Sequence, residues 1–241
     1  MTDHLARDDP AAGASTIRRP VLAIDTCFQS CSAAVGLFAG HELIRTVARF
    51  EPMQTGQAER IVGMVGDVVT EAGVAMADVG LVAVTVGPGS FTGTRIGIAA
   101  AKGLGLALGV PTAGVTSLQV IAVQLAKAGA ADGREMCVAI DMGRHDIYVQ
   151  VFDETGFEAR IPARLIRSGE IDDFAAAHAA VVLGHGPCFS AQATPLSQYF
   201  LPHAETVVAL VTQCRRKLTP AVALYLRAPD AKPPGSGVGR T

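Results

Sequence analysis

The stretch VTVGPGSFTGTRIGIAAAKGLGLAL, residues 84–108, decides the fold of this chain. It starts within an apolar, β-branched run at residues 81–86, breaks at the GPGS sequence of residues 87–90, and resumes with helix-forming residues near Thr92 to Thr94. Because glycine and proline interrupt regular structure, this pattern predicts a strand, a tight turn and a helix, in that order.

The predicted helix is unusual because it contains three glycines, Gly97, Gly103 and Gly105. Each glycine inside a helix costs about 1 kcal/mol relative to alanine, so a lone surface helix would not keep three of them without compensation. Gly97, Ala101, Gly105 and Gly109 recur every four residues and therefore share one side of the helix. A side lined by small residues lets another backbone approach closely, and the spacing leaves open whose backbone it is.

The composition is that of a globular protein with a large core. The chain has 241 residues, enough for one large domain or two small lobes, and 49% of them are hydrophobic while 17% are charged. The net charge of -2 and the pI of about 6.3 exclude a global basic surface for nucleic acid. Any contact with RNA therefore needs a local patch or a partner chain.

Cysteine usage and the hydrophobic runs indicate a cytoplasmic protein. The five cysteines form no C-x-x-C pair and are odd in number, which is typical of buried, reduced thiols. Residues 1–19 hold no apolar core of signal-peptide length, and we expect a flexible extension there. Residues 96–115 form a long apolar run, but Lys102, the glycines and Pro111 argue against a membrane span.

The remaining pattern predicts alternating strands and helices in both halves. In the first half we expect strands at 21–24, 32–38, 41–50, 81–86 and 112–115, and helices at 55–70, 94–108 and 116–128. In the second half we expect strands at 136–140, 147–152, 157–161 and 181–183, and helices at 168–180, 205–214 and near Ala221. Residues 229–241 are rich in proline and glycine and are expected to be a flexible tail.

The second half of the sequence echoes the first. A shift of 116 positions places the AID sequence of residues 23–25 on the AID sequence of residues 139–141, and Val35 on Val151. This echo favours two related α/β lobes with mixed sheets. Asp25 and Asp141 then end the first strand of each lobe, where an aspartate facing a central cleft can hold a phosphate or a metal, or is simply tolerated by the strand end.

Five segments resemble one known family, TsaB (formerly YeaZ), over residues 21–232. They are LAIDTCFQSCSAAV, VGPGSFTGTRIGIAAAKGLGLALGVPTAGVTSLQVIA, AIDMGRHDIYVQVF, LGHG and ALYLRAPDAKP. The resemblance implies the actin-like (ASKHA), duplicated ribonuclease-H-like fold, an α/β fold whose two lobes have mixed sheets. We accordingly expect an extension at 1–19, a first lobe at 20–115 with the pairing helices, a second lobe at 116–228 and a tail at 229–241.

The resemblance also implies a role in tRNA modification. In that family TsaB pairs with the related subunit TsaD, and the ATPase TsaE joins them. TsaD transfers a threonylcarbamoyl group to N6 of the adenosine next to the anticodon of tRNAs that read ANN codons, and TsaB supports that transfer without performing it. By resemblance, this chain is a non-catalytic, cytoplasmic subunit that contacts tRNA through the complex and can form a homodimer when TsaD is absent.

The resemblance places the pairing surface on the two helices at about 55–70 and 94–108. The glycine stripe is therefore interpreted as the side that admits the backbone of the partner. The expected partner contacts are Thr55, Ala58, Ile61, Val62, Val65 and Val69 on the first helix, and Thr94, Gly97, Ala101, Leu104, Gly105 and Leu108 on the second.

The sequence gives only weak signals for a ligand site. GPGSFTGT is not a Walker loop, because Gly93 rather than lysine precedes Thr94. The turn can bind an anion through backbone amides at the helix N-terminus, or its glycines only shape the turn while Ser90 or Thr92 caps the helix. The weak candidates for nucleotide or anion contacts are Asp25, Thr26, Ser90, Arg95, Asp141, Gly184 and Gly186.

Catalytic and metal chemistry are not expected of this chain. TsaD holds its metal with a His-x-x-x-His pair and an aspartate, whereas no two histidines here are three or four residues apart. Gln57 stands where relatives often carry a histidine, and residues 142–145 also depart from the family. We expect no tightly bound cofactor, with ATP or ADP bound only weakly or in the assembled complex. Two alternatives stay open: an independent actin-like kinase or ATPase, and a purely homodimeric interaction protein.

Overall fold

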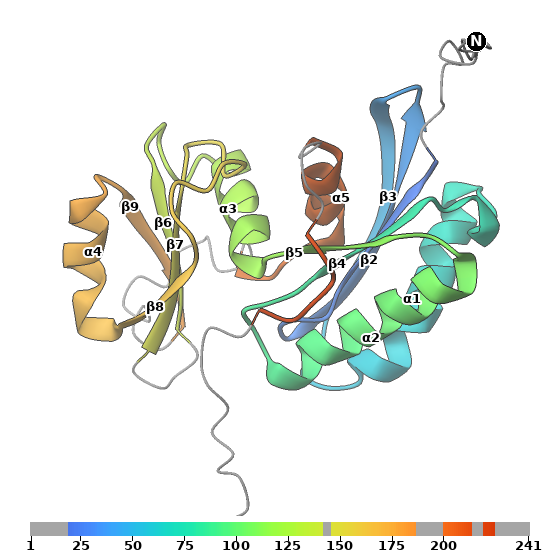
Figure 1. Ribbon diagram of the computed structural model, residues 1–241, viewed down its shortest axis with the longest axis horizontal. Helices are drawn as coiled ribbons and strands as arrows, with labels where there is room; N and C mark the ends of the chain where they lie inside the picture. The colour runs from blue at the N-terminus through green and yellow to red at the C-terminus, as the bar shows by residue number, and fades with distance from the viewer. Residues whose placement is uncertain (1–18, 142–145, 187–199, 214–218, 225–241) are drawn as a thin grey trace, which may run out of the picture.

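The computed structural model describes residues 19–141, 146–186, 200–213 and 219–224, which form two lobes (Figure 1). The chain begins with strands β1 (Val21–Asp25), β2 (Ser30–Ala39) and β3 (Glu42–Pro52) and helix α1 (Gln57–Ala72). After a 3-10 turn at Met76–Asp78 come β4 (Leu81–Thr85), α2 (Phe91–Leu108) and β5 (Thr112–Val115). The strand, turn and helix predicted for the opening stretch are therefore confirmed.

The second lobe repeats the strand arrangement of the first. Helix α3 (Ser117–Lys127) leads to β6 (Met136–Asp141), β7 (Asp146–Phe152), β8 (Arg164–Arg167), α4 (Ile171–Ala177), β9 (Val181–His185) and α5 (Ala204–Gln213). The first sheet has the order β3-β2-β1-β4-β5 and the second β8-β7-β6-β9. In both, the first strand of the lobe pairs antiparallel with the next strand and parallel with a later one. The predicted echo between the halves thus has a structural counterpart.

Alternating side chains of β1 decide which helix covers which face of the first sheet. Leu22 and Ile24 point to the face covered by α1 and α2, while Val21 and Ala23 point to the face covered by α5. In the second lobe, α3 packs on one face of the sheet and α4 on the other. Figure 1 shows α1 and α2 together on the first lobe, α4 at the outer edge of the second, and α3 between the two sheets.

Two elements predicted in the second half are wrong. Residues 157–161 form no continuous strand, and Ala159 makes only an isolated antiparallel bridge with Phe152. Asp153 binds the local turn instead: its Oδ1 accepts from Glu158 N at 3.1 Å and its Oδ2 from Thr155 Oγ1 at 2.6 Å. The residues near Ala221 are not helical. Leu224 N donates to Val86 O at 2.8 Å, which keeps this segment along the first lobe.

The boundary predicted for the second lobe also needs correction. Helix α5 contributes Val207 and Val208 to the core beneath β1 and β2 of the first sheet, and Ala221 joins the core beneath α1 and α2. The chain therefore returns to the first lobe before residue 228. Helix α4 is shorter than the predicted 168–180, since a 3-10 turn at Ser168–Glu170 precedes it and it ends at Ala177. The expected extension and tail lie outside the described residues, apart from Arg19.

None of the helices in the four described ranges combines the length and the apolar character that crossing a lipid bilayer requires.

Candidate functional site

The GPGSFTG turn sets the start of α2 against the loop after β1. Ser90 N donates to Cys27 O at 2.7 Å, and Ser90 Oγ accepts from Gly93 N at 3.3 Å, so Ser90 is the helix cap. A Cβ on Gly93 would lie 2.1 Å from Thr26 O. Glycine is therefore required at position 93 for α2 to approach the chain this closely.

The glycine stripe of α2 faces inward, onto the first sheet. A Cβ on Gly97 would lie 2.6 Å from Thr26 Oγ1, and one on Gly105 would lie 2.5 Å from Thr112 Cγ2. Ala101 between them is fully buried. The backbone that the stripe admits is the chain's own, and the prediction that these residues contact a partner is wrong. Small and apolar residues occur all round α2, so their spacing does not identify the side that faces out.

The other predicted partner contacts divide between the core and the surface. Ile61, Val65 and Val69 of α1 are buried in the core, as is Thr94 of α2, so these four predictions are wrong as well. Leu104 and Leu108 are half-buried. Three predicted contacts on or near α1 are exposed, so they stay predictions of partner contact: Thr55, Ala58 and Val62.

The surface that α1 and α2 do present is smooth and partly apolar. Its glycines are different ones: no atom lies within 4 Å of a Cβ built on Gly66 or Gly103, and a Cβ on Gly63 meets only the tip of Arg60. Val62 is 67% and Leu106 86% exposed. We call this surface the helix-pair face and define it by the exposed residues Val62, Gly63, Gly66, Ala99, Gly103 and Leu106.

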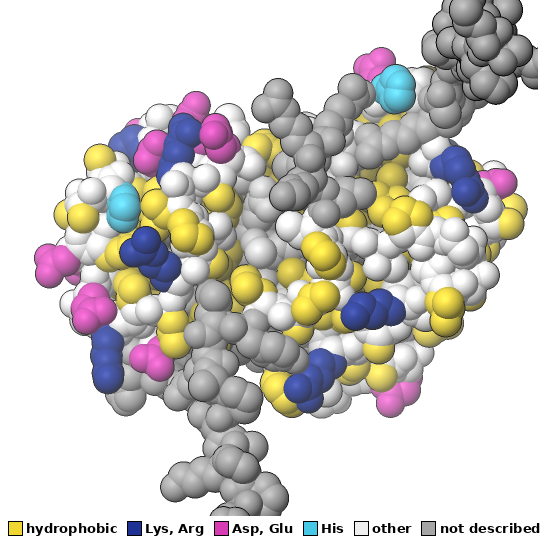
Figure 2. Space-filling view, in the orientation of Figure 1, with side chains coloured by type: hydrophobic (Ala, Val, Ile, Leu, Met, Phe, Trp, Pro, Cys, Tyr) yellow, Lys and Arg dark blue, Asp and Glu magenta, His cyan; other side chains and the backbone are white. Residues whose placement is uncertain are grey.

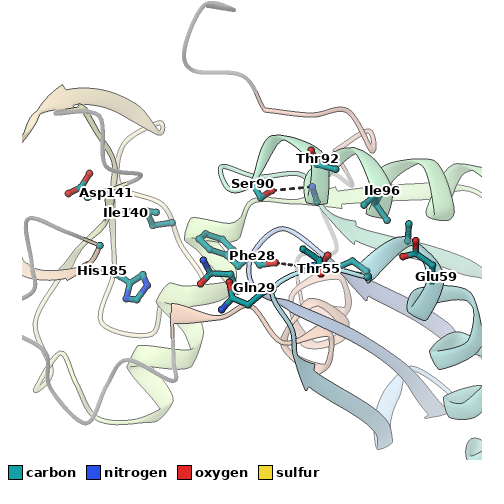
Figure 3. Close-up of a pocket in the computed structure, with 16 residues that line it drawn as sticks. Phe28, Gln29, Thr55, Glu59, Ser90, Thr92, Ile96, Ile140, Asp141 and His185 are labelled. Carbon is teal, nitrogen blue, oxygen red and sulfur yellow. Dashed lines mark hydrogen bonds between the residues drawn. The ribbon is translucent and has the colours of Figure 1, made fainter.

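A cavity of about 740 Å³ opens between the lobes at one end of the helix-pair face. The first turns of α1 and α2 line it from the first lobe, and the ends of β6 and β9 line it from the second. Figure 3 shows Phe28, Ser90 and Thr92 on one side and Asp141 and His185 on the other. The cavity also includes Gln29, a position that sequence reasoning missed.

The cavity brings together only part of the predicted ligand contacts. Three of the seven line it: Ser90, Asp141 and Gly186. Asp25 and Thr26 are fully buried beneath the turn, while Arg95 and Gly184 do not line the cavity. The two buried residues were wrong as cleft contacts because the turn and the start of α2 cover the end of β1. Thr26 Oγ1 donates to Gly93 O at 2.7 Å and so fixes that cover.

Asp25 is a buried carboxyl that links strands. Its Oδ1 accepts from Thr85 Oγ1 on β4 and from Cys27 N, while its Oδ2 has no hydrogen-bond partner. Burial disfavours the charged form and raises the pKa of Asp25 to about 7, against the lowering effect of these hydrogen bonds. Burial also raises the pKa of the Cys27 thiol to about 12, which leaves it an unreactive neutral group.

Two further polar side chains of the cavity, those of His185 and Gln57, are uncharged at neutral pH. Burial lowers the pKa of His185, which stacks on Phe200 with 5.3 Å between ring centroids, so its imidazole is neutral at pH 7. Gln57, at the start of α1, donates through Nε2 to Phe28 O and Met53 O, both at 3.3 Å. In the part of the chain that the structure describes, no three histidine, cysteine or acidic residues lie together as metal ligands would.

Comparison with known proteins places the chain in a family. The family model described as TsaD, tRNA N6-adenosine threonylcarbamoyltransferase, matches residues 52–181, more than half of the chain. The tRNA threonylcarbamoyladenosine biosynthesis protein TsaB of Escherichia coli K12 is 39% identical over 105 residues, which are 42% of each chain. The structure of YeaZ from Pseudomonas aeruginosa matches 87% of this chain and 100% of its own length, with a TM-score of 0.66 and 25% identity.

The chain belongs to this family, in its TsaB (YeaZ) branch.

TsaB membership confirms the family resemblance and the actin-like, duplicated ribonuclease-H-like fold predicted from the sequence. An uncharacterized protein of Mycobacterium leprae is 33% identical over 213 residues, which are 88% of this chain and 56% of that protein. The chain therefore spans little more than half the length of that relative. Because the match leaves much of that relative uncovered, the activity and partners of this chain are treated below as proposals.

Proposed function

We propose that this chain acts in tRNA threonylcarbamoyladenosine biosynthesis as the non-catalytic TsaB subunit. Relatives in three bacteria are named tRNA threonylcarbamoyladenosine biosynthesis protein TsaB, at 30–39% identity. In this proposal the chain pairs with a TsaD-like catalytic subunit and activates it, a TsaE-like ATPase joins them, and tRNA is contacted through the complex.

The observation that carries the proposal is the helix-pair face. Val62 and Leu106 leave most of their apolar surface in water. Beside them, no atom of the described residues lies within 4 Å of a Cβ built on Gly66 or Gly103, and only the tip of Arg60 approaches Gly63. An exposed apolar patch of this kind is typical of an interaction site. The absent Cβ atoms let the helices of a partner approach within backbone contact, so a pair of helices is the partner element that fits best.

Reconstitution tests the proposal directly. The chain alone is expected to modify no tRNA, whereas addition of a TsaD-like subunit, a TsaE-like ATPase, the adenylate-forming synthase, ATP, threonine and bicarbonate gives threonylcarbamoyladenosine. Gly103→Leu is expected to abolish that activity while the monomer stays folded, because the position is open. Gly169→Leu is the matched control, since Gly169 also has no atom within 4 Å and lies in the second lobe. Modification by the chain alone would contradict the proposal.

The interlobe cavity supports a weaker role for nucleotide. The first turn of α2 opens onto it and can offer backbone N–H groups to a phosphate, although the Asp141 carboxylate opposes an anion there. We infer that ATP or ADP binds weakly to the isolated chain and that partner subunits complete any tighter site. Isothermal titration separates this from the alternative of an independent actin-like kinase, which binds Mg-ATP tightly and turns it over without partners.

A further inference from the structure

Helix α2 carries its charged and aromatic side chains on one side, which is turned away from α1. Phe91, Arg95 and Lys102 follow one another at spacings of four and seven residues, so the helix period of 3.6 places all three on the same side. All three are exposed. Ala100 and Leu104, on the other side of α2, pack toward the core shared with α1. We call the side that carries Phe91, Arg95 and Lys102 the α2 flank.

The elements around the α2 flank carry no acidic residue. Residues 79–131 span β4, α2, β5 and α3 and contain three basic side chains but no aspartate or glutamate. Residues 219–224, which bond to Gly114 and Val86 at their two ends, are uncharged as well. By contrast, β3 and α1 together carry five acidic and three basic residues. A chain with a net charge of -2 therefore has a local basic surface over α2, where Figure 2 shows dark-blue side chains among hydrophobic ones.

Arg95 is held in place by an aromatic ring. Its Cζ lies 3.5 Å from the centroid of the Phe91 ring, with the guanidinium group over the ring face. This contact is attractive because the face of an aromatic ring carries negative charge density, and it orders a side chain that would otherwise sample many rotamers in water. Phe91 is nevertheless 59% exposed. The α2 flank therefore presents an aromatic surface next to an ordered cation.

We propose that the α2 flank is a contact surface for the tRNA substrate, an inference that rests on the proposed role in tRNA modification. Arg95 and Lys102 bind phosphates, and the stack of Phe91 and Arg95 receives an unpaired base. RNA matches both features, because its phosphates attract cations and its unpaired bases stack on aromatic rings and guanidinium planes. At 1.5 Å per residue, Arg95 and Lys102 are about 10 Å apart along the helix, so they contact different phosphates.

An acidic protein surface is the competing partner for the α2 flank. It accounts for the two cations but not for the exposed ring, because carboxylates pair with cations and are repelled by the negative face of an aromatic ring. The three flank residues are also not among those that define the helix-pair face. Contact with RNA at the flank therefore does not require a paired subunit to leave that face.

Binding of an unmodified tRNA transcript to the reconstituted complex, measured at several salt concentrations, tests the proposal. One phosphate contact contributes about 0.7–0.9 to the slope of log affinity against log salt. Arg95→Gln and Lys102→Gln are each expected to reduce the slope by that amount and to weaken binding about five- to eight-fold at about 0.1 M salt. Phe91→Leu is expected to weaken binding about five-fold or more with an unchanged slope, since it removes a stacking surface and no charge. Arg45→Gln is the matched control, because Arg45 is exposed on β3 at the opposite edge of the sheet.

Size-exclusion chromatography with the TsaD-like subunit separates loss of RNA contact from loss of pairing. The three flank variants are expected to pair as wild type does and to differ only in tRNA binding. Flank variants that match Arg45→Gln in tRNA affinity and salt slope would overturn the proposal. Loss of pairing with unchanged tRNA affinity would overturn it as well and would assign the flank to an acidic protein partner. In both cases the wild-type complex still modifies tRNA, whereas failure of the proposed function leaves that complex inactive, so the two failures are distinguishable.

Discussion

Two glycines on opposite sides of α2 provide a sharp test of how this helix is placed. Gly97 faces the sheet and Gly103 faces solvent, although both are in the interior of the same helix and neither has a left-handed backbone. Replacing each with alanine is the smallest possible change. Both substitutions gain the same helix propensity, so any difference between them reports what the new methyl group meets.

The structure gives the expected magnitudes. At Gly103 the methyl group meets nothing within 4 Å, so Gly103→Ala is expected to stabilise the monomer by up to about 1 kcal/mol, or about 2–4 °C in Tm for a chain of this size. At Gly97 it would lie 2.6 Å from Thr26 Oγ1 and 3.3 Å from Val84 Cγ2. Overpacking of this kind costs about 1–3 kcal/mol. The buried bond from Thr26 to Gly93 O is also displaced, so Gly97→Ala is expected to be destabilising by about 1–3 kcal/mol in total.

Urea unfolding and thermal melts of both variants, at a concentration where the chain is monomeric, check this prediction. The expected result is a shift in opposite directions, with Gly103→Ala above wild type and Gly97→Ala below it. If both variants are stabilised, the stripe at Gly97 is open to solvent and the original reading of a partner-facing stripe is restored. If both are destabilised, Gly103 packs against a part of the chain and the helix-pair face is misplaced.

Three further predictions concern polar side chains that hold local structure together. The folded protein keeps the Asp25 carboxyl protonated up to about pH 7, whereas the unfolded chain releases that proton near pH 4. As the pH rises from 4 to 7, the free energy of unfolding of wild type is therefore expected to fall relative to Asp25→Asn, by on the order of 4 kcal/mol. Urea titrations at several pH values measure this difference, and parallel pH curves for the two proteins would contradict it. Ser90→Ala removes the cap of α2 and is expected to lower the free energy of unfolding by about 1 kcal/mol, with Ser90→Asp as the rescuing control. Gln124 Nε2 donates to Leu201 O at 3.0 Å, and its Oε1 accepts from His203 N at 2.9 Å. Gln124→Ala is therefore expected to lower the free energy of unfolding by about 2–3 kcal/mol, and an unchanged urea midpoint would show that water replaces the amide.

The alternation of strands and helices was predictable because it depends on local signals. The GPGS break, the Thr116 cap of α3 and the apolar period of α1 each act over a few residues, and the structure confirms them. Residues 219–224 were not predictable in this way. Thr219 forms a bridge with Gly114 of β5, which lies 105 positions earlier in the chain. A local sequence pattern cannot predict a contact between residues so far apart.

The site was less predictable than the fold because its key property is the phase of a helix. A stripe at Gly97, Ala101 and Gly105 and a stripe at Ala99, Gly103 and Leu106 both consist of small or apolar residues, so the sequence distinguishes them poorly. The phase is decided by Thr26 and Thr112, whose side chains occupy the space next to the inner stripe. Thr26 lies 71 positions before Gly97, and Thr112 is brought next to Gly105 only by the turn that leads into β5. The pattern within the helix reveals neither contact, which is why the partner-facing assignment had the wrong side of α2.

The inner and outer sides of α2 also constrain how any loss of pairing should be interpreted. A side chain larger than hydrogen at Gly97 or Gly105 pushes α2 away from β4 and β5, and that movement displaces Gly103 and Leu106 on the outer side with it. If the chain pairs as proposed, such a variant is expected to lose partner binding even though the altered residue faces the sheet. Loss of pairing therefore assigns an interface only when the free energy of unfolding of the monomer is unchanged. Among the glycines of α2, only Gly103 combines exposure with open space, and it is the position at which binding and stability can be separated.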